Sequence, residues 1–201
     1  MINVLTEEET REGYRLLFDG KSLNGWAATQ FSDGWAVEEG TIICTVKGDG
    51  YLHTVDRYED FLLRIDFKTE PNVNSGIFIR WTDLSDPVNT GLEMQILDTY
   101  HKETVGNHDC GAVYELVAPS TNAVRPAGEW NHAEIICQGS QIQITLNDTP
   151  IIDMDIDQWS VPGKNPDGTP NKFTYAWKDL SRSGYIGLQD HGGRVLFRNI
   201  K

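Results

Sequence analysis

Hydrophobic and polar residues alternate over many short stretches of this chain. The clearest stretch is residues 58–70, where the residues on one side are Phe61, Leu63, Ile65 and Phe67. A period of two residues is typical of a β-strand with one buried face. About a dozen strands of this kind are expected, with turn residues between them. They fall within residues 14–18, 34–46, 58–70, 74–81, 91–98, 111–117, 130–156 and 183–200.

This pattern predicts an all-β protein with an antiparallel β-sandwich or jelly-roll fold. Only the start of the chain looks helical, because Thr6 and Glu9 form a capping-box pattern and Gly13 supplies a stop. Tight turns are expected at Glu39-Gly40, Gly139, Asn147-Asp148 and Gly192-Gly193. At 201 residues, the chain is predicted to be one domain over 1–201.

The segment 157–183 breaks the strand pattern. It contains three prolines and four aromatic residues, Trp159, Phe173, Tyr175 and Trp177. A long irregular connection inside a compact domain is often a lid or a binding loop. A surface insertion whose aromatic side chains pack against the sandwich is an equally good interpretation.

Composition narrows the classes of partner. The net charge of -13 argues against nucleic acid and anionic membranes, since both repel an acidic surface. No apolar run reaches membrane-spanning length. The three cysteines are widely spaced and predict reduced thiols rather than a disulfide framework or a zinc site. The chain as given shows no signal peptide, so a cytoplasmic location is expected, or a periplasmic or secreted one if a signal has been removed.

Several strands are expected to carry large polar groups on the face away from the core. In residues 91–98, the core side must be Leu92, Met94 and Ile96, so Glu93 and Gln95 point the other way. In the strand before it, the better core set is Ile77, Ile79 and Trp81, which places Arg80 outward beside Phe78. In residues 184–193, Gln189 and His191 share the non-core face with Tyr185.

If these three strands lie side by side, their outer face forms a groove that suits a sugar. Amides, a carboxylate and a guanidinium pair with hydroxyl groups, and an aromatic ring covers the apolar face of a pyranose. The alternative for each residue alone is an ordinary solvated or cross-strand-paired side chain. The choice between them depends on the strand order.

Six motifs occur in an order that resembles the bacterial 3-keto-disaccharide hydrolase family, and the similarity runs from about Thr6 to the last residue. The motifs are LLFDGKSLNGW (16–26), NSGIFIR (74–80), LEMQILD (92–98), GAVYELVAP (111–119), GEWNHAEI (128–135) and IGLQDHGGRVLFRNI (186–200). The resemblance implies a concanavalin A-like jelly roll and an enzyme that cleaves glycosidic bonds of sugars oxidised at C3.

The implied chemistry differs from ordinary glycoside hydrolysis, in which two carboxylates act on the glycosidic bond. A ketone at C3 acidifies the C2–H bond, so one general base removes the proton, the aglycone leaves from C1, and water adds back. One base, one acid for the leaving oxygen, and a cation or metal at the enediolate oxygen are sufficient.

The resemblance assigns roles to particular residues. Glu93 and His191 are the candidate acid/base pair, because histidine both donates and accepts protons near neutral pH, and Arg80 is the candidate fixed cation. Gln95 and Gln189 are expected to orient hydroxyl groups. The further substrate-binding candidates are Tyr114, whose strand has two equally good core sets, Asp98, His108 and Trp177.

Three questions stay open on the sequence. A divalent metal is compatible with His, Glu, Asp and Gln ligands, but no spacing requires one. A non-catalytic carbohydrate-binding module on the same fold is the main alternative, and a structural domain without a ligand is another. The sequence carries no signal for the aglycone or for the oligomeric state.

Overall fold

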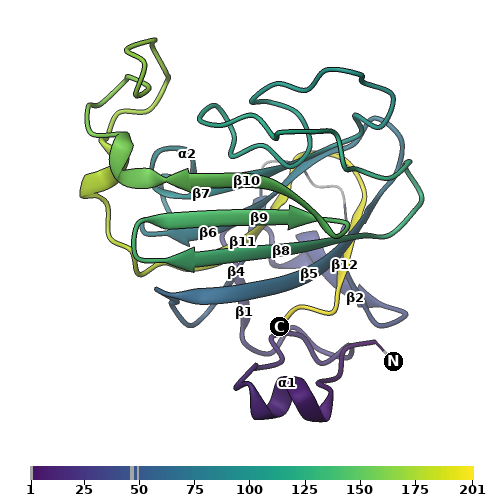
Figure 1. Ribbon diagram of the computed structural model, residues 1–201. Helices are drawn as coiled ribbons and strands as arrows, with labels where there is room; N and C mark the ends of the chain where they lie inside the picture. Colours follow the sequence, from purple (N-terminus) through teal and green to yellow (C-terminus); the bar gives the residue numbers. More distant parts are fainter. Residues whose placement is uncertain (1, 46–47, 49) are drawn as a thin grey trace.

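Two antiparallel β-sheets face each other across a hydrophobic core (Figure 1). The computed structural model describes residues 2–45, 48 and 50–201. One sheet has five strands in the order β1-β4-β11-β6-β7, and the other has seven in the order β10-β9-β8-β5-β12-β3-β2. The predicted all-β antiparallel sandwich, a jelly roll, is confirmed.

Of the twelve strands among the described residues, ten lie within the predicted segments, and β1 and β4 were not predicted. The five-stranded sheet consists of β1 (Trp26–Ala28), β4 (Gly50–Thr54), β6 (Asn74–Trp81), β7 (Leu92–Leu97) and β11 (Tyr185–Asp190). The seven-stranded sheet consists of β2 (Trp35–Glu38), β3 (Thr41–Cys44), β5 (Phe61–Thr69), β8 (Asn131–Gln138), β9 (Gln141–Leu146), β10 (Thr149–Asp155) and β12 (Val195–Arg198).

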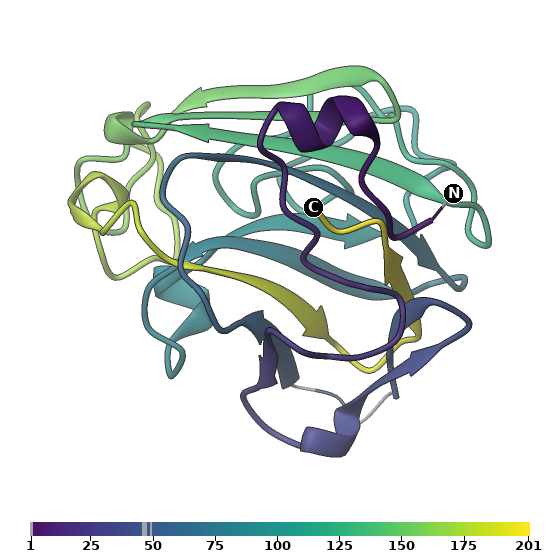
Figure 2. The same ribbon diagram turned by 90° about the horizontal axis from the view of Figure 1, so that it is seen from below.

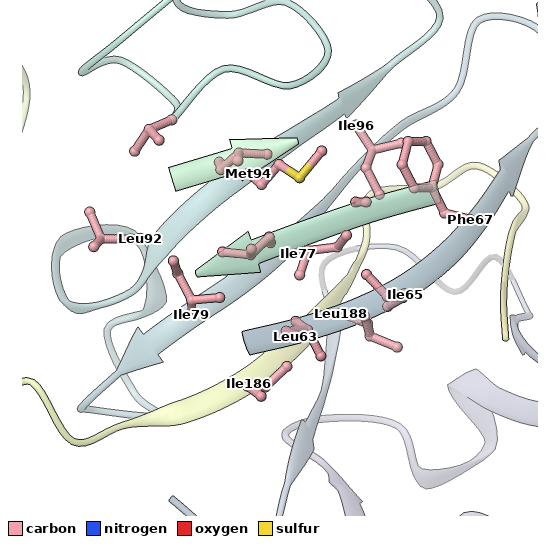
Figure 3. Packing of buried hydrophobic residues seen from close by; sticks show 14 of the residues in the cluster. Leu63, Ile65, Phe67, Ile77, Ile79, Leu92, Met94, Ile96, Ile186 and Leu188 are labelled. Carbon is pink, nitrogen blue, oxygen red and sulfur yellow. The ribbon is translucent and has the colours of Figure 1, made fainter. Parts of the chain in front are cut away.

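The core lies between the two sheets and is built from the alternate residues that the sequence pattern selects. On β5, Leu63, Ile65 and Phe67 are almost completely buried. They meet Ile77 and Ile79 of β6, together with residues of β7 and β11, across the gap between the sheets (Figure 3). Burying an aliphatic or aromatic side chain stabilises the fold by about 1.5–3 kcal/mol. The opposite face of each strand is therefore free to carry polar groups.

The N-terminal helix α1 (Glu7–Arg11) is confirmed with its capping box, in which Thr6 and Glu9 exchange side-chain to backbone hydrogen bonds. Gly13, at φ +87°, follows the helix in the left-handed region, as the predicted stop requires. Glu9 Oε1 also accepts from Lys201 Nζ (2.5 Å) and Arg64 Nη1 (3.2 Å). These contacts, Lys201 foremost, lower the pKa of Glu9 to about 2, and they hold the helix close to the C-terminus (Figure 2).

Two predicted segments differ from the structure. Residues 14–18 form no strand, and residues 111–117 form only isolated bridges, with Val113 paired to Met94 and to Val117. The tight turns at 39–40 and 147–148 are present, each with two consecutive residues at positive φ. Val46, at the end of the predicted hairpin, lies outside the described residues.

Outside the strands, the described chain has few helical turns. They are α2 (Pro87–Thr90), which the sequence pattern did not predict, and three 3₁₀ turns, η1 (Ser32–Gly34), η2 (Ile156–Gln158) and η3 (Trp177–Asp179). None of the described helices has the length and apolarity needed to cross a membrane. The loop 157–183 buries Trp159, Phe173 and Trp177, whereas Tyr175 is 49% exposed.

Candidate active site

A cavity of about 240 Å³ opens on the face of the five-stranded sheet that points away from the core. Its floor comes from four adjacent strands, β4, β11, β6 and β7. The three strands whose polar faces the sequence singled out are therefore neighbours, which was the condition for a groove. The floor residues are Tyr51, Asn74, Phe78, Glu93, Gln95 and Gln189.

Loops form the walls of this cavity. Tyr114 and Leu116 come from the segment after β7, and Lys172, Phe173 and Trp177 come from the loop 157–183. The volume is below the roughly 300–1,000 Å³ of drug-sized ligand sites, which favours a ligand about the size of one sugar ring. Phe173 and Trp177 of the loop 157–183 are buried and also border the cavity, whereas the buried Trp159 does not line it, so the loop has features of both interpretations.

Glu93 is partly buried on the cavity floor, and its carboxyl group lies directly over Gly76 of the neighbouring strand. A Cβ atom at Gly76 would come within 2.2 Å of Glu93 Oε1, so only glycine leaves room for this position. Within the described chain, no hydrogen bond reaches this carboxyl group. Burial raises the pKa of Glu93 to about 7, and the positive charge of Lys172 acts in the opposite direction. Such a group can accept and return a proton near neutral pH.

The two glutamines of the floor differ in how they are held. Gln95 is 3% exposed, and its Nε2 donates to Asn74 Oδ1 (2.6 Å) and to the Ile96 carbonyl (3.1 Å). Gln189 Nε2 lies 3.5 Å from the Tyr51 hydroxyl, and its Oε1 has no hydrogen-bond partner among the described residues. The indole Nε1 of Trp177 likewise has none. Buried polar atoms without partners are rare in folded proteins.

His191 lies at the mouth of the cavity, immediately after β11 ends. The preceding residue, Asp190, is 1% exposed and anchors the turn, because its carboxyl oxygens accept from the backbone N–H of Gly192 (2.9 Å) and Gly48 (3.1 Å). Asp190 was not among the predicted site residues, because the two-residue alternation of this strand places it on the core face.

Two predicted rim residues lie outside the cavity lining. His108 bonds to Glu115 and stacks against the ring of Tyr114, with 4.8 Å between ring centroids, so it supports a wall residue. Asp98 accepts from the backbone N–H of Asn72 (3.1 Å). Tyr114 itself lines the cavity, which resolves its ambiguous orientation.

The predicted position of Arg80 is wrong. The four residues of β6 from Phe78 to Trp81 lie opposite only three residues of β11, Tyr185 to Gly187, which is a β-bulge. Arg80, within the bulge, has φ +51°. The bulge reverses the alternation. Trp81 therefore joins Phe78 on the cavity side of the sheet, where their ring centroids are 5.8 Å apart, and Arg80 does not line the cavity.

Arg80 instead connects loops at the edge of the sandwich. Its Nη1 donates to the Gly139 carbonyl (2.7 Å), its Nε to the Glu59 carbonyl (3.3 Å), and its Nη2 pairs with Asp60 Oδ1 (3.3 Å). With 3% of its surface exposed, this guanidinium is a structural group.

Replacing Arg80 by methionine is expected to lower the free energy of unfolding by about 1.5–3 kcal/mol, because the carbonyl oxygens of Glu59 and Gly139 lose their charged donor. Urea unfolding measures this, with the exposed Arg11→Met as control. The kcat of the folded Arg80→Met protein is expected to stay within a few-fold of wild type. A large loss of kcat with an unchanged free energy of unfolding would show that Arg80 acts in the active site.

Metal ligation was left open by the sequence. The described residues contain no group of three or more His, Cys, Asp or Glu side chains placed to hold a metal ion. The three cysteines are buried and form no disulfide with one another. Among the described residues, the polar groups that line the cavity are three amides, two carboxyl groups, two tyrosine hydroxyls, one ammonium and one imidazole. This set suits an organic ligand with several hydroxyl groups.

Comparison with known proteins identifies the family of this chain. The model of the 3-keto-alpha-glucoside-1,2-lyase-like domain matches residues 13–201. The chain belongs to this family. One relative of this chain is a 3-keto-disaccharide hydrolase from Bacteroides thetaiotaomicron, with 26% identity over an alignment of 225 residues. The alignment covers 94% of this chain and 78% of that protein. The resemblance drawn from the six motifs is thereby confirmed.

Several solved structures have the same fold as this chain. One candidate glycosyl hydrolase from Parabacteroides distasonis has a TM-score of 0.80 and 33% identity, and the match covers 90% of this chain and 93% of that one. A second from the same organism has a TM-score of 0.80 and 28% identity, with coverage of 100% and 97%. A carbohydrate-binding module of Bacillus subtilis, at 15% identity and a TM-score of 0.52, shares the fold alone.

Proposed function

We propose that the cavity is the active site of an enzyme that cleaves glycosides already oxidised to a ketone at C3. The observation that carries this proposal is the carboxyl group of Glu93, which lies over Gly76 with a pKa raised to about 7. Removal of a proton next to a ketone needs one base of this kind. Family membership and the name of the Bacteroides relative support the same substrate class.

The reaction begins at the C2–H bond. The Glu93 carboxylate takes the C2 proton, the electron pair of that bond forms a C2=C3 double bond, and negative charge moves onto the ketone oxygen. The ketone then re-forms as the electron pair shifts to make a C1=C2 double bond, and the C1–O bond to the aglycone breaks. The departing oxygen takes a proton from His191, which lies at the mouth of the cavity.

Hydration completes the cycle. A water molecule adds its oxygen to C1 and gives a proton to His191, and Glu93 returns its proton to C2. The sum is one glycosidic bond cleaved and one water consumed, with both side chains restored. Release before hydration would give an unsaturated sugar, so a single site accounts for both lyase and hydrolase activity.

The remaining cavity groups suit the ring of a sugar. Gln189 Oε1 and Trp177 Nε1 are an acceptor and a donor that are buried without partners among the described residues, and a turn of either side chain would bring its atom to the cavity. A sugar presents both hydroxyl donors and oxygen acceptors, so its binding would satisfy two costly buried groups. Tyr51, Phe78 and Phe173 supply apolar surface for the ring.

The test is release of the aglycone from 4-nitrophenyl 3-keto-glucoside, with the unoxidised glucoside as control. Release from the ketone and none from the control is expected. Binding of the 3-keto-glucoside without any release would overturn the enzyme proposal in favour of a carbohydrate-binding module. Absence of both binding and release would favour a domain without a sugar ligand.

The pH dependence of this reaction should report Glu93. Because only the carboxylate accepts the C2 proton, kcat/KM is expected to rise with pH up to about 7, and to fall again at higher pH where the acid that protonates the departing oxygen has lost its proton. Below about pH 7, the expected slope is about tenfold per unit. Initial rates between about pH 5 and about pH 9 measure it. A constant kcat/KM down to pH 5 would show that a carboxyl group with an ordinary pKa, or a different group, is the base.

A further inference from the structure

The proposed reaction places negative charge on the ketone oxygen, and this charge needs a positive partner. Arg80 cannot supply it, because its guanidinium is bonded to Glu59, Asp60 and Gly139 outside the cavity. Among the described residues that line the cavity, Lys172 is the only lysine or arginine. The resemblance and the strand pattern gave this residue no role.

The ammonium group of Lys172 is held above an aromatic wall. Its Nζ lies 4.2 Å from the centroid of the Tyr114 ring and 5.8 Å from that of Phe173. A cation over an aromatic face is attracted by about 0.5–1 kcal/mol at an exposed site. This contact connects the loop 157–183 with the segment that follows β7, and it directs the positive charge toward the cavity.

The backbone on both sides of Lys172 is fixed. Asn171 donates its N–H to the Gly163 carbonyl (2.9 Å), and Thr174 donates its N–H to Asn89 Oδ1 beside α2 (3.1 Å). Phe173 packs edge-on against Trp177, with 4.9 Å between ring centroids. The lysine therefore projects from a braced part of the loop. A cation that is already in position costs little reorganisation during a reaction.

Lys172 and Glu93 line the same cavity. In the described part of the chain they form no ion pair, yet the positive charge of Lys172 acts to lower the pKa of Glu93. The two groups are thus close enough to interact, and both border the same cavity. The space between them is where a ring carbon and its ketone oxygen can lie.

We propose that Lys172 is a catalytic residue, the ammonium group that donates a hydrogen bond to the ketone oxygen of the sugar while the C2 proton moves to Glu93. This inference rests on the proposed function. Proton transfer moves one negative charge from Glu93 to the ketone oxygen. A cation in contact with that oxygen, but not with the carboxylate, stabilises the transition state more than the ground state. The sugar would also displace water from the ammonium, which strengthens the attraction.

The test compares Lys172→Met, Lys172→Arg and Lys164→Met, an exposed lysine of the same loop outside the cavity lining. With 3-keto-glucoside, Lys172→Met is expected to lower kcat by about a hundredfold, the usual loss for one oxyanion donor, with a smaller change in KM. Lys172→Arg should recover part of the rate, and Lys164→Met should match wild type. An active wild type with an equally active Lys172→Met would overturn the inference alone.

A second readout does not depend on turnover. Titration of the Glu93 carboxyl carbon by ¹³C NMR is expected to give a higher pKa in Lys172→Met than in wild type and no change in Lys164→Met, because the opposing charge is lost. An unchanged Glu93 titration in Lys172→Met would also overturn the inference. If wild type releases no aglycone, the proposed function fails, and the catalytic role of Lys172 falls with it.

Discussion

Replacement of Glu93 by glutamine is expected to lower kcat/KM for a 3-keto-glucoside by at least about a hundredfold, the usual contribution of a general base. Glutamine keeps the size of the side chain above Gly76 but cannot accept the C2 proton. Steady-state rates measure the loss, with the exposed Glu70→Gln as matched control. Substrate affinity should be retained, because the other cavity groups are unchanged. Activity within a few-fold of wild type would remove Glu93 from the role of base.

The same variant should be more stable than wild type at high pH. The pKa of Glu93 is raised from 4.5 to about 7 in the folded protein, so the folded state holds more protons than the unfolded state between these values. The wild type therefore loses stability as the pH rises through this window, by about 3 kcal/mol in total. Glu93→Gln lacks this loss. Its gain in free energy of unfolding over wild type should be larger at pH 8 than at pH 4, and an equal difference at both would contradict the raised pKa.

Substitution of Gly76 by alanine should inactivate the enzyme although it removes no polar group. The added Cβ would lie 2.2 Å from Glu93 Oε1 and 2.8 Å from its Cγ and Cδ, so the whole carboxyl group must move. A displaced base no longer meets the C2–H bond, and misplacement of about 1 Å can cost about a hundredfold in rate. We expect a loss of kcat of that size, measured on the 3-keto-glucoside.

A matched control is available on the neighbouring part of the sheet. Gly50, at the start of β4, has nothing within 4 Å of an added Cβ, so Gly50→Ala should keep wild-type activity. Circular dichroism and thermal unfolding establish that both variants fold. A folded Gly76→Ala enzyme with wild-type kcat would show that the position of Glu93 over this glycine is not required.

The strand faces could be predicted where the alternation is unbroken. In β5 and β7, the core residues follow from the two-residue period, and so does the orientation of Glu93 and Gln95 toward the opposite face. The adjacency of β11, β6 and β7 could not be predicted, because the pairing of distant strands depends on the packing of the whole sandwich. The prediction of a groove therefore depended on the strand order, which the sequence does not give.

Two further features gave no signal in the sequence. Arg80 follows Ile79 in a regular apolar alternation, and no glycine marks the bulge at which Arg80 adopts a positive φ. Lys172 lies in an irregular loop, where no periodicity relates a residue to a sheet face. Its contact with Tyr114 joins two segments that lack regular strands, and such contacts are set by tertiary packing.

In the proposed reaction, Glu93 removes the C2 proton before the glycosidic bond breaks. This step is tested most directly with 4-nitrophenyl 3-keto-glucoside carrying deuterium at C2, by comparing the rate of nitrophenol release with that of the protiated compound. We expect slower release from the deuterated compound by the wild type, with loss of C2 deuterium to the solvent seen by NMR, and neither effect in Glu93→Gln. Equal rates, together with complete retention of deuterium at C2 in the released sugar, would contradict the account.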